Sequence, residues 1–124
     1  MSPTILLVDD ERLIRWSVAA RLKAEDYDVL EADSGRSARE HLSAAFDVML
    51  LDRRLPDTDG LMLLRQLKTL KPAIPVILIT SDASRDFNEE AIRLGAHDVL
   101  GKPFDLDDVA RAVSGALGCR RSAP

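Results

Sequence analysis

Five polar side chains stand at or just after the ends of apolar runs in this sequence: Asp9, Asp10, Asp52, Thr80 and Lys102. If these runs are neighbouring strands, the three carboxylates converge and repel one another, so a cation must compensate their charge. Oxygen ligands suit a hard divalent cation, most simply Mg²⁺. A Lys ammonium and a Thr hydroxyl beside metal-bound carboxylates favour a site for a phosphoryl group. Asp52 is then the candidate nucleophile, because carboxylates can form aspartyl-phosphates.

Each of these residues also has an ordinary structural interpretation. An Asp at a strand end is usually a turn residue or a helix cap, and Thr80 can end one strand and cap the next helix. Lys102-Pro103 can simply belong to a loop. The chemical interpretation is favoured because all of these residues lie at the ends of apolar runs that are spread over the whole chain.

Three long apolar runs predict strands that are buried on both faces, at Thr4–Val8, 47–52 and 75–80. Such continuous runs are typical of parallel sheets that helices cover on both sides. Turn and periodicity signals predict the remaining elements. Shorter strands are expected at 27–31 and 98–100, and helices at 11–24, 34–44, 59–71, 84–94 and from an N-cap at Asp105 onward.

The alternation of strand and helix predicts an α/β fold. Right-handed crossovers then give a three-layer α/β/α sandwich with a five-stranded parallel sheet and five helices. The flavodoxin-like strand order 2-1-3-4-5 places the strand that ends at Asp9 and Asp10 beside the strand that ends at Asp52. We expect residues 1–118 to form this single domain and residues 119–124 to be a disordered tail or the start of a linker.

Composition and charge exclude several classes of protein. The chain has 124 residues, of which 46% are hydrophobic and 31% charged, and its formal net charge is -4. This mild acidity argues against direct nucleic-acid binding by the domain. No apolar run approaches the roughly 20 residues of a membrane span, so no membrane association is expected. Cys119 is the single cysteine, which excludes an internal disulfide and favours a cytoplasmic location.

Together with three short segments, the five polar residues resemble the receiver (CheY-like) domain of two-component response regulators. The segments are the loop 55–60, the pair Gly95-Ala96 and the run 102–104. The resemblance implies a regulatory phosphoacceptor domain rather than an enzyme. Asp52 would take a phosphoryl group from a phosphohistidine of a sensor histidine kinase or phosphotransfer protein, with a homodimer as one possible assembly.

The resemblance also implies a ligand set for the metal. Asp10 and Asp52 would bind Mg²⁺ directly, and Asp9 would act largely through water. The backbone carbonyl of Arg54 would be a further ligand.

Thr80 and Lys102 would bind the phosphoryl oxygens, and the small side chain of Ser81 would leave room for them. One position departs from the family's pattern, because Val99 stands where these domains usually carry Tyr or Phe. In the family's switching mechanism the Thr hydroxyl moves to the phosphate and the aromatic ring swings into the vacated space. Valine has no ring and a single stiff χ1 torsion, so this route of readout is in question.

Residues 14–16 and 102–108 resemble, more narrowly, the receivers of NtrC-type regulators, which precede an ATPase and a DNA-binding domain. We therefore expect control of transcription through a fused output domain that lies outside these 124 residues. The alternatives are a stand-alone receiver and a phosphate-independent interaction domain. A small phosphatase or a flavodoxin-like redox protein has less support. Arg54 stands where a phosphatase would have a second Asp, and no Ser/Thr-rich loop follows Leu7.

Three further expectations concern the surface. The exposed face of the first helix, around Arg12, Arg15 and Ala19, would carry kinase specificity, and Trp16 is expected to be partly buried beside it. The two arginines after Asp52, at positions 53 and 54, are either solvated loop charges or cations that shield the acceptor and tune hydrolysis.

Overall fold

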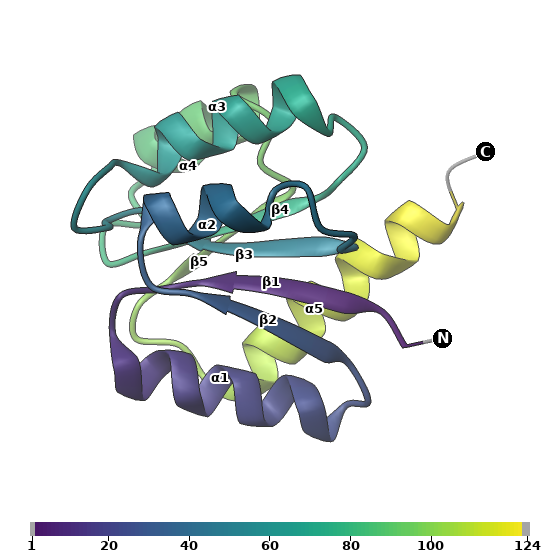
Figure 1. Ribbon diagram of the computed structural model, residues 1–124. Coiled ribbons are helices and arrows are strands. Elements are labelled where there is room, and N and C mark those ends of the chain that lie inside the picture. The colour runs from purple at the N-terminus through teal and green to yellow at the C-terminus, as the bar shows by residue number, and fades with distance from the viewer. Residues whose placement is uncertain (1, 123–124) are drawn as a thin grey trace.

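The structure is a computed structural model that describes residues 2–122 (Figure 1). The strands are β1 (Thr4–Val8), β2 (Asp28–Ala32), β3 (Val48–Asp52), β4 (Val76–Thr80) and β5 (Asp98–Gly101). The helices are α1 (Arg12–Ala24), α2 (Gly35–His41), α3 (Gly60–Leu70), α4 (Arg85–Arg93) and α5 (Leu106–Ser122). All strand pairs are parallel, in the order β2-β1-β3-β4-β5. The predicted sandwich and its strand order are therefore confirmed.

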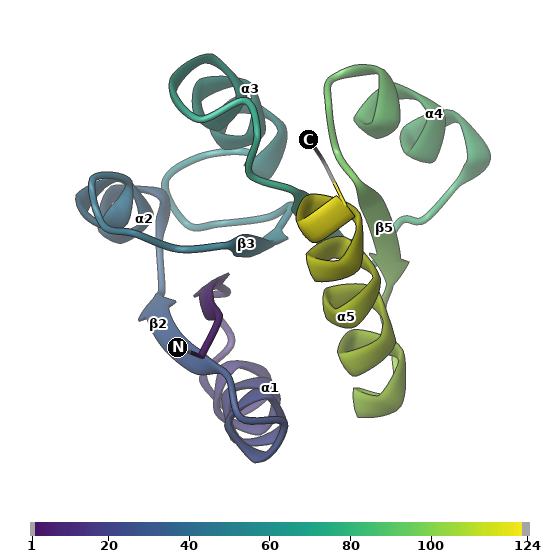
Figure 2. The same ribbon diagram turned by 90° about the vertical axis from the view of Figure 1, so that its right-hand side faces the viewer.

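Apolar side chains on the two faces of the sheet form two separate cores. Helices α2, α3 and α4 cover one face, and α1 and α5 cover the other (Figure 1, Figure 2). The three central strands contribute to both cores, because successive side chains of a strand point to opposite faces. This explains why their sequences are apolar without alternation. On the side of α2 to α4 they contribute Leu6, Val8, Met49, Leu51, Val76 and Leu78, and on the other side Ile5, Leu7, Val48, Leu50, Ile77 and Ile79.

Helix α2 is shorter than predicted, because it ends at His41 rather than near Ala44. The Ala44 N–H donates to the His41 carbonyl in a turn, and the Lys71 ammonium donates to the Ala44 carbonyl at 2.7 Å. Contacts from the end of α3 thus replace the last helical turn that the sequence pattern predicts.

Helix α5 is longer than predicted, because it continues to Ser122 although a tail was expected from Cys119. A glycine costs about 1 kcal/mol relative to alanine inside a helix, and Gly115 lies in the second half of α5. Buried apolar contacts around it, including Val113 and Ala116, keep the helix on the sheet. Residues 123–124 lie outside the described residues. No helix within residues 2–122 is long and apolar enough to cross a bilayer.

The register of the sheet brings the carboxyl ends of its central strands to one edge. Asp52 pairs with Ile79, and Thr80 pairs with Gly101. Residues that directly follow β1 and β5 reach the same edge, because all strands run in one direction. The residues with chemical potential therefore share one end of the molecule.

Candidate functional site

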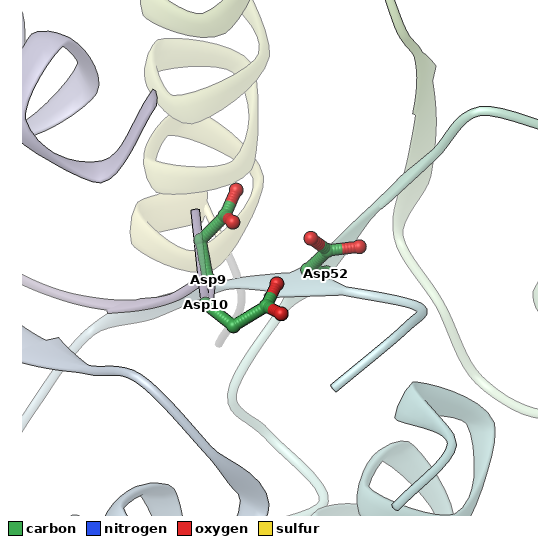
Figure 3. Close-up of side chains that lie close together, drawn as sticks. All are labelled: Asp9, Asp10 and Asp52. Atoms are coloured by element: carbon green, nitrogen blue, oxygen red, sulfur yellow. The ribbon is translucent and has the colours of Figure 1, made fainter. Parts of the chain in front are cut away.

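Three carboxylates meet at the carboxyl ends of β1 and β3. Asp9, Asp10 and Asp52 each offer a ligand oxygen, and these oxygens all lie within 4.8 Å of one another (Figure 3). Asp9 and Asp52 are buried, whereas Asp10 is exposed. The convergence that the predicted strand order required is therefore observed, and the three groups differ in their access to solvent.

Lys102 provides the positive charge at this cluster. Its ammonium lies 3.0 Å from the Asp52 carboxylate, 2.8 Å from Glu11 and 3.9 Å from Asp9. Burial alone would lower the pKa of Lys102, but hydrogen bonds to Glu11 and Asp52 and the charges of Asp9 and Asp52 outweigh it. The pKa of Lys102 is therefore raised, and this side chain stays protonated throughout the physiological range.

Glu11 is a residue of the site that the sequence interpretation missed. It follows the acidic pair directly and precedes the first helical residue of α1. Its carboxylate holds Lys102 across 91 positions of the chain. The signal in the sequence was a third consecutive acidic residue after β1, which we had assigned to the helix alone.

Asp52 is oriented by two donors. The Arg54 N–H donates to one carboxylate oxygen at 3.1 Å, and Lys102 donates to the other at 3.0 Å. The side chain is nearly buried, and it lies at the floor of a hollow of about 210 Å³. Around this hollow are Asp10, Glu11, Asp52, Arg53, Arg54, Thr80, Ser81 and Lys102. The Asp52 carboxylate is thus held in one orientation and faces this hollow.

A larger hollow of about 790 Å³ lies elsewhere on the molecule, around Phe46 and Lys71 near the amino ends of the strands. Its Lys71 ammonium is already bound to the Ala44 carbonyl and lies 4.7 Å from the centre of the Phe46 ring. It contains no cluster of ligand oxygens comparable to the acidic one, within the residues that the structure describes. The smaller hollow, which holds the acidic cluster, is therefore the candidate site.

Asp9 is the group whose surroundings fit a cation best. One of its oxygens accepts the Glu11 N–H at 2.8 Å, and the other is buried without a hydrogen-bond partner. Burial raises the pKa of Asp9 from its usual value to about 7; the Glu11 N–H opposes this rise and the charge of Asp52 adds to it. A buried oxygen without a partner, next to two further carboxylates, fits a hard divalent ion such as Mg²⁺.

Thr80 ends β4 with its hydroxyl at the same hollow. Its oxygen accepts the Asp82 N–H at 3.0 Å, and its carbonyl accepts the Lys102 N–H at 2.7 Å. The hydroxyl proton can therefore be donated to another group. Ser81 is small and exposed beside it, which leaves the hollow open above Asp52. The predicted role of the Arg54 carbonyl as a metal ligand stays a prediction.

The loop that follows Asp52 is fixed to α2 through Asp57. Its carboxylate accepts the Gly35 N–H at 2.8 Å and the Arg36 N–H at 2.9 Å. These two hydrogen bonds lower the pKa of Asp57. A Cβ atom on Gly35 would lie 2.4 Å from the Thr58 methyl group, so glycine allows the close approach of helix and loop.

Helix α1 presents a different surface from the one expected. Ala19 is buried, and Arg15 turns inward to Glu31 at 3.3 Å, so neither forms part of an exposed docking face. Trp16 was expected to be partly buried, yet it is 70% exposed. Leu13 on the same helix is 80% exposed. The apolar stripe of this helix faces the sheet, and Trp16 lies outside that stripe.

Gly60 allows α3 to begin in close contact with the backbone of Asp52 and Arg53. A Cβ atom there would lie 2.6 Å from the Asp52 carbonyl oxygen and 2.8 Å from the Arg53 Cα, both of which are backbone atoms. We therefore expect Gly60→Ala to lower the free energy of unfolding by about 1–3 kcal/mol, as overpacking does. Gly115→Ala is the matched control, because nothing lies within 4 Å of its added Cβ. Chemical denaturation should show that the control is at least as stable as the parent. Equal stability of the two variants would contradict the steric role of Gly60.

The sequence profile of the response regulator receiver domain matches residues 5–114. The chain therefore belongs to the family of response regulator receiver domains. It is 39% identical over 114 residues to the transcriptional regulatory protein ZraR of Escherichia coli (strain K12), which covers 91% of this chain and 26% of that protein. It is 37% identical over 112 residues to the DNA-binding transcriptional regulator NtrC of Klebsiella pneumoniae, which covers 90% of this chain and 24% of that protein.

Solved structures show the same relationship. The CheY-like receiver domain protein from Methanospirillum hungatei JF-1 superposes with a TM-score of 0.92 at 27% identity, covering 98% of both chains. The receiver domain of NtrX from Brucella abortus gives a TM-score of 0.85 at 35% identity, covering 92% of this chain and 98% of that one. The resemblance to NtrC-type receivers is thus confirmed. The chain spans about a quarter of the length of the curated relatives it matches.

Proposed function

We propose that this domain is a phosphoacceptor switch in which Asp52 takes a phosphoryl group from a phosphohistidine. The observation that carries the proposal is the joint placement of a buried, oriented Asp52 with Lys102 at 3.0 Å and two further carboxylates within 4.8 Å. This arrangement offers a nucleophilic oxygen, a fixed cation and a cation site around one hollow. A carboxylate placed in this way can attack phosphorus, and the leaving imidazole keeps the electrons of the broken phosphorus–nitrogen bond.

Asp9, Asp10 and Asp52 would hold Mg²⁺, with the Arg54 carbonyl as a further ligand. Bound there, the ion would neutralise charge that builds up on the phosphoryl oxygens. The exposed carboxylate of Asp10 would bind the ion directly. One oxygen of Asp9 is engaged by the Glu11 N–H, so the buried oxygen without a partner is the one that would face the ion, directly or through water.

Lys102 and Thr80 would bind the phosphoryl oxygens once they are present. Lys102 now binds Asp52 directly, and transfer to the phosphoryl group would keep its charge next to negative oxygens. The Thr80 hydroxyl has a proton to donate, because its oxygen only accepts from Asp82. Both movements would draw β5 and the loop after β4 toward the acceptor.

We propose a sensor histidine kinase or phosphotransfer protein as the donor of the phosphoryl group. The exposed face of α1 that borders the site carries Arg12, Leu13 and Trp16. An apolar surface with a cation at its side suits a protein partner. For the output, we propose transcription control by other domains of a longer protein, because the matching relatives are transcriptional regulators of which this chain spans about a quarter.

Incubation with acetyl phosphate tests the proposal without a kinase. In the presence of Mg²⁺, intact mass spectrometry should show that the protein gains one phosphoryl group, and excess EDTA should prevent the gain. Acid or hydroxylamine should remove the group, as expected of an acyl phosphate. A protein that gains no phosphoryl group over a range of donor and Mg²⁺ concentrations would exclude the phosphoacceptor function.

Removing the exposed member of the acidic cluster should weaken the metal site. We expect Asp10→Ala to lower Mg²⁺ affinity by at least about tenfold, because even outer ligands of metal sites contribute that much. The rate of phosphorylation by acetyl phosphate should fall with it at low Mg²⁺ and recover partly at high Mg²⁺. The matched control is Asp28→Ala, which removes an exposed carboxylate at the other end of the sheet. Equal Mg²⁺ affinity of both variants in calorimetric titration would argue against Asp10 as a ligand.

A further inference from the structure

Arg53 follows the acceptor directly, and its backbone is held in place. Its N–H donates to the Ile79 carbonyl of β4 at 2.8 Å, and its carbonyl accepts the Gly60 N–H at 2.5 Å. Because Gly60 packs against the Arg53 Cα, the main chain has little room to shift there. Any response of Arg53 to a new charge on Asp52 must therefore come from its side chain.

The Arg53 side chain links the acceptor to helix α4. Its guanidinium carbon lies 4.3 Å from the centre of the Phe87 ring, and Phe87 is a nearly buried residue of α4. The guanidinium also lies 3.6 Å from the carboxylate of Asp82, in the loop between β4 and α4. At the same time Arg53 lines the hollow above Asp52. One cation thus contacts both the acceptor hollow and the first turn of a helix.

Asp82 is held from two sides. Its backbone N–H donates to the Thr80 hydroxyl, and its carboxylate pairs with Arg53. Thr80 and Arg53 therefore restrain the same residue of the loop that leads into α4. If both side chains turn toward a group on Asp52, Asp82 loses both restraints together.

We propose that Arg53 is a second cation, beside Lys102, that responds to the phosphoryl group and releases α4. A phosphoryl group carries a charge of about −2 at neutral pH. It would compete for the Arg53 guanidinium with a partly solvated carboxylate and a ring face, both of which are weaker partners. In moving, Arg53 leaves Phe87 and Asp82, so the start of α4 is free to shift.

This role answers the question that Val99 raises. Val99 is a partly buried residue that packs on the core beneath α2 to α4, and it has no ring to report a movement of Thr80. In this chain the aromatic ring of the readout is Phe87 of α4, and the side chain that moves is Arg53. The proposal rests on the phosphoacceptor function of Asp52.

NMR spectroscopy of the whole 124-residue chain can test this role directly. The Arg53 δ and ε protons lie near the ring face of Phe87, so in the free protein they should show an upfield ring-current shift. Saturation with Mg²⁺ and beryllofluoride, which mimics an acyl phosphate, should abolish this shift. It should also move the amide resonances of residues 82–88. If the Arg53 protons keep their ring-current shift in the saturated protein, the proposal is wrong.

Three variants test this role, two at Arg53 and one at its partner Asp82. Arg53→Met keeps an unbranched side chain over Phe87 without the charge, and at saturation its mimic-induced amide shifts at residues 82–88 should be less than half those of the parent. Arg53→Lys should restore part of the response. Asp82→Asn cuts the ion pair at nearly unchanged shape, so its amides at residues 84–88 should move partway toward the mimic-bound positions before any mimic is added.

Arg36→Met is the matched control, because it removes an exposed arginine on α2 and changes the net charge equally. Its amide shifts at residues 82–88 should equal those of the parent. Equal shifts in Arg53→Met and Arg36→Met would overturn the proposal, and so would free Asp82→Asn resonances identical to those of the free parent. The mass gain with acetyl phosphate distinguishes failure of the proposed phosphoacceptor function from failure of the Arg53 proposal alone. A parent that gains no phosphoryl group removes the proposed function, whereas one that is phosphorylated with Arg53 still on Phe87 removes only this inference.

Discussion

Asp52→Asn should abolish phosphorylation by acetyl phosphate. The amide cannot act as the nucleophile, although it is almost the same size as the carboxylate and can still accept the Arg54 N–H. Intact mass should therefore show one added phosphoryl group on the parent and none on the variant. We expect the rate to fall by more than about 10³-fold, as the loss of a catalytic nucleophile typically costs.

The matched control for this substitution is Asp28→Asn, which makes the same chemical change on an exposed residue of β2. It should be phosphorylated as fast as the parent. Asp52→Asn also removes one of three neighbouring negative charges and so lowers the repulsion between them. The Asp52→Asn variant should therefore melt at or above the temperature of the parent in EDTA. A fully labelled Asp52→Asn variant with an intact fold would show that another side chain is the acceptor.

Asp9→Asn should stabilise the metal-free protein at high pH and leave its stability nearly unchanged at low pH. The pKa of Asp9 is raised to about 7 from 3.8, mainly by burial. The folded state therefore binds a proton that the unfolded state has already released between these two values. Because the folded state holds more protons in this window, stability falls as the pH rises through it.

Well below pH 3.8 Asp9 is protonated in both states and has no effect, and well above pH 7 it is ionised in both states and its full cost is felt. We expect Asp9→Asn to gain on the order of 2 kcal/mol over the parent at pH 8 in EDTA, and little at about pH 3.5. Asp10→Asn is the control, since its exposed carboxylate is screened by solvent. Mg²⁺ should reverse the order, because it stabilises only the proteins that can bind it. Parallel stability curves for parent and Asp9→Asn in EDTA across this pH range would rule out the buried charge.

The sheet was predictable because its signal is local. Ile5 to Val8 and Val48 to Leu51 are apolar on both faces, which only a strand covered on both sides requires. Once the strands are parallel, their carboxyl ends must share an edge, so the grouping of Asp9 with Asp52 followed from topology alone. Trp16 could also have been placed correctly, because it lies roughly 200° around the helix from Ile14 and Val18, which face the sheet.

Contacts between distant side chains could not be predicted in this way. The sequence does not show that Glu11 would bind Lys102, because both are long, flexible residues that many loop conformations would leave in solvent. The same holds for the stacking of Arg53 on Phe87, because the sequence does not distinguish a loop arginine in solvent from one that packs on a ring. The Ala44 carbonyl beyond the end of α2 accepts a hydrogen bond from Lys71, which directly follows α3. Each of these outcomes is decided by packing, which periodicity does not encode.

The hydrogen bonds that Asp57 makes to α2 suggest which surfaces of the domain would stay the same on phosphorylation and which would change. Asp57 of this loop accepts hydrogen bonds from the first two N–H groups of α2, whereas the contacts described between Arg53 and the α4 side involve side chains, the Phe87 ring and the Asp82 carboxylate. If these hydrogen bonds persist on phosphorylation, a partner that binds α2 would meet nearly the same surface in both states. Such a partner would have no differential affinity, so its coupling free energy with phosphorylation would be close to zero. If the proposed release of α4 holds, a permanent tether on the α2 side would leave the switching equilibrium unchanged, whereas contacts around α4 would change it.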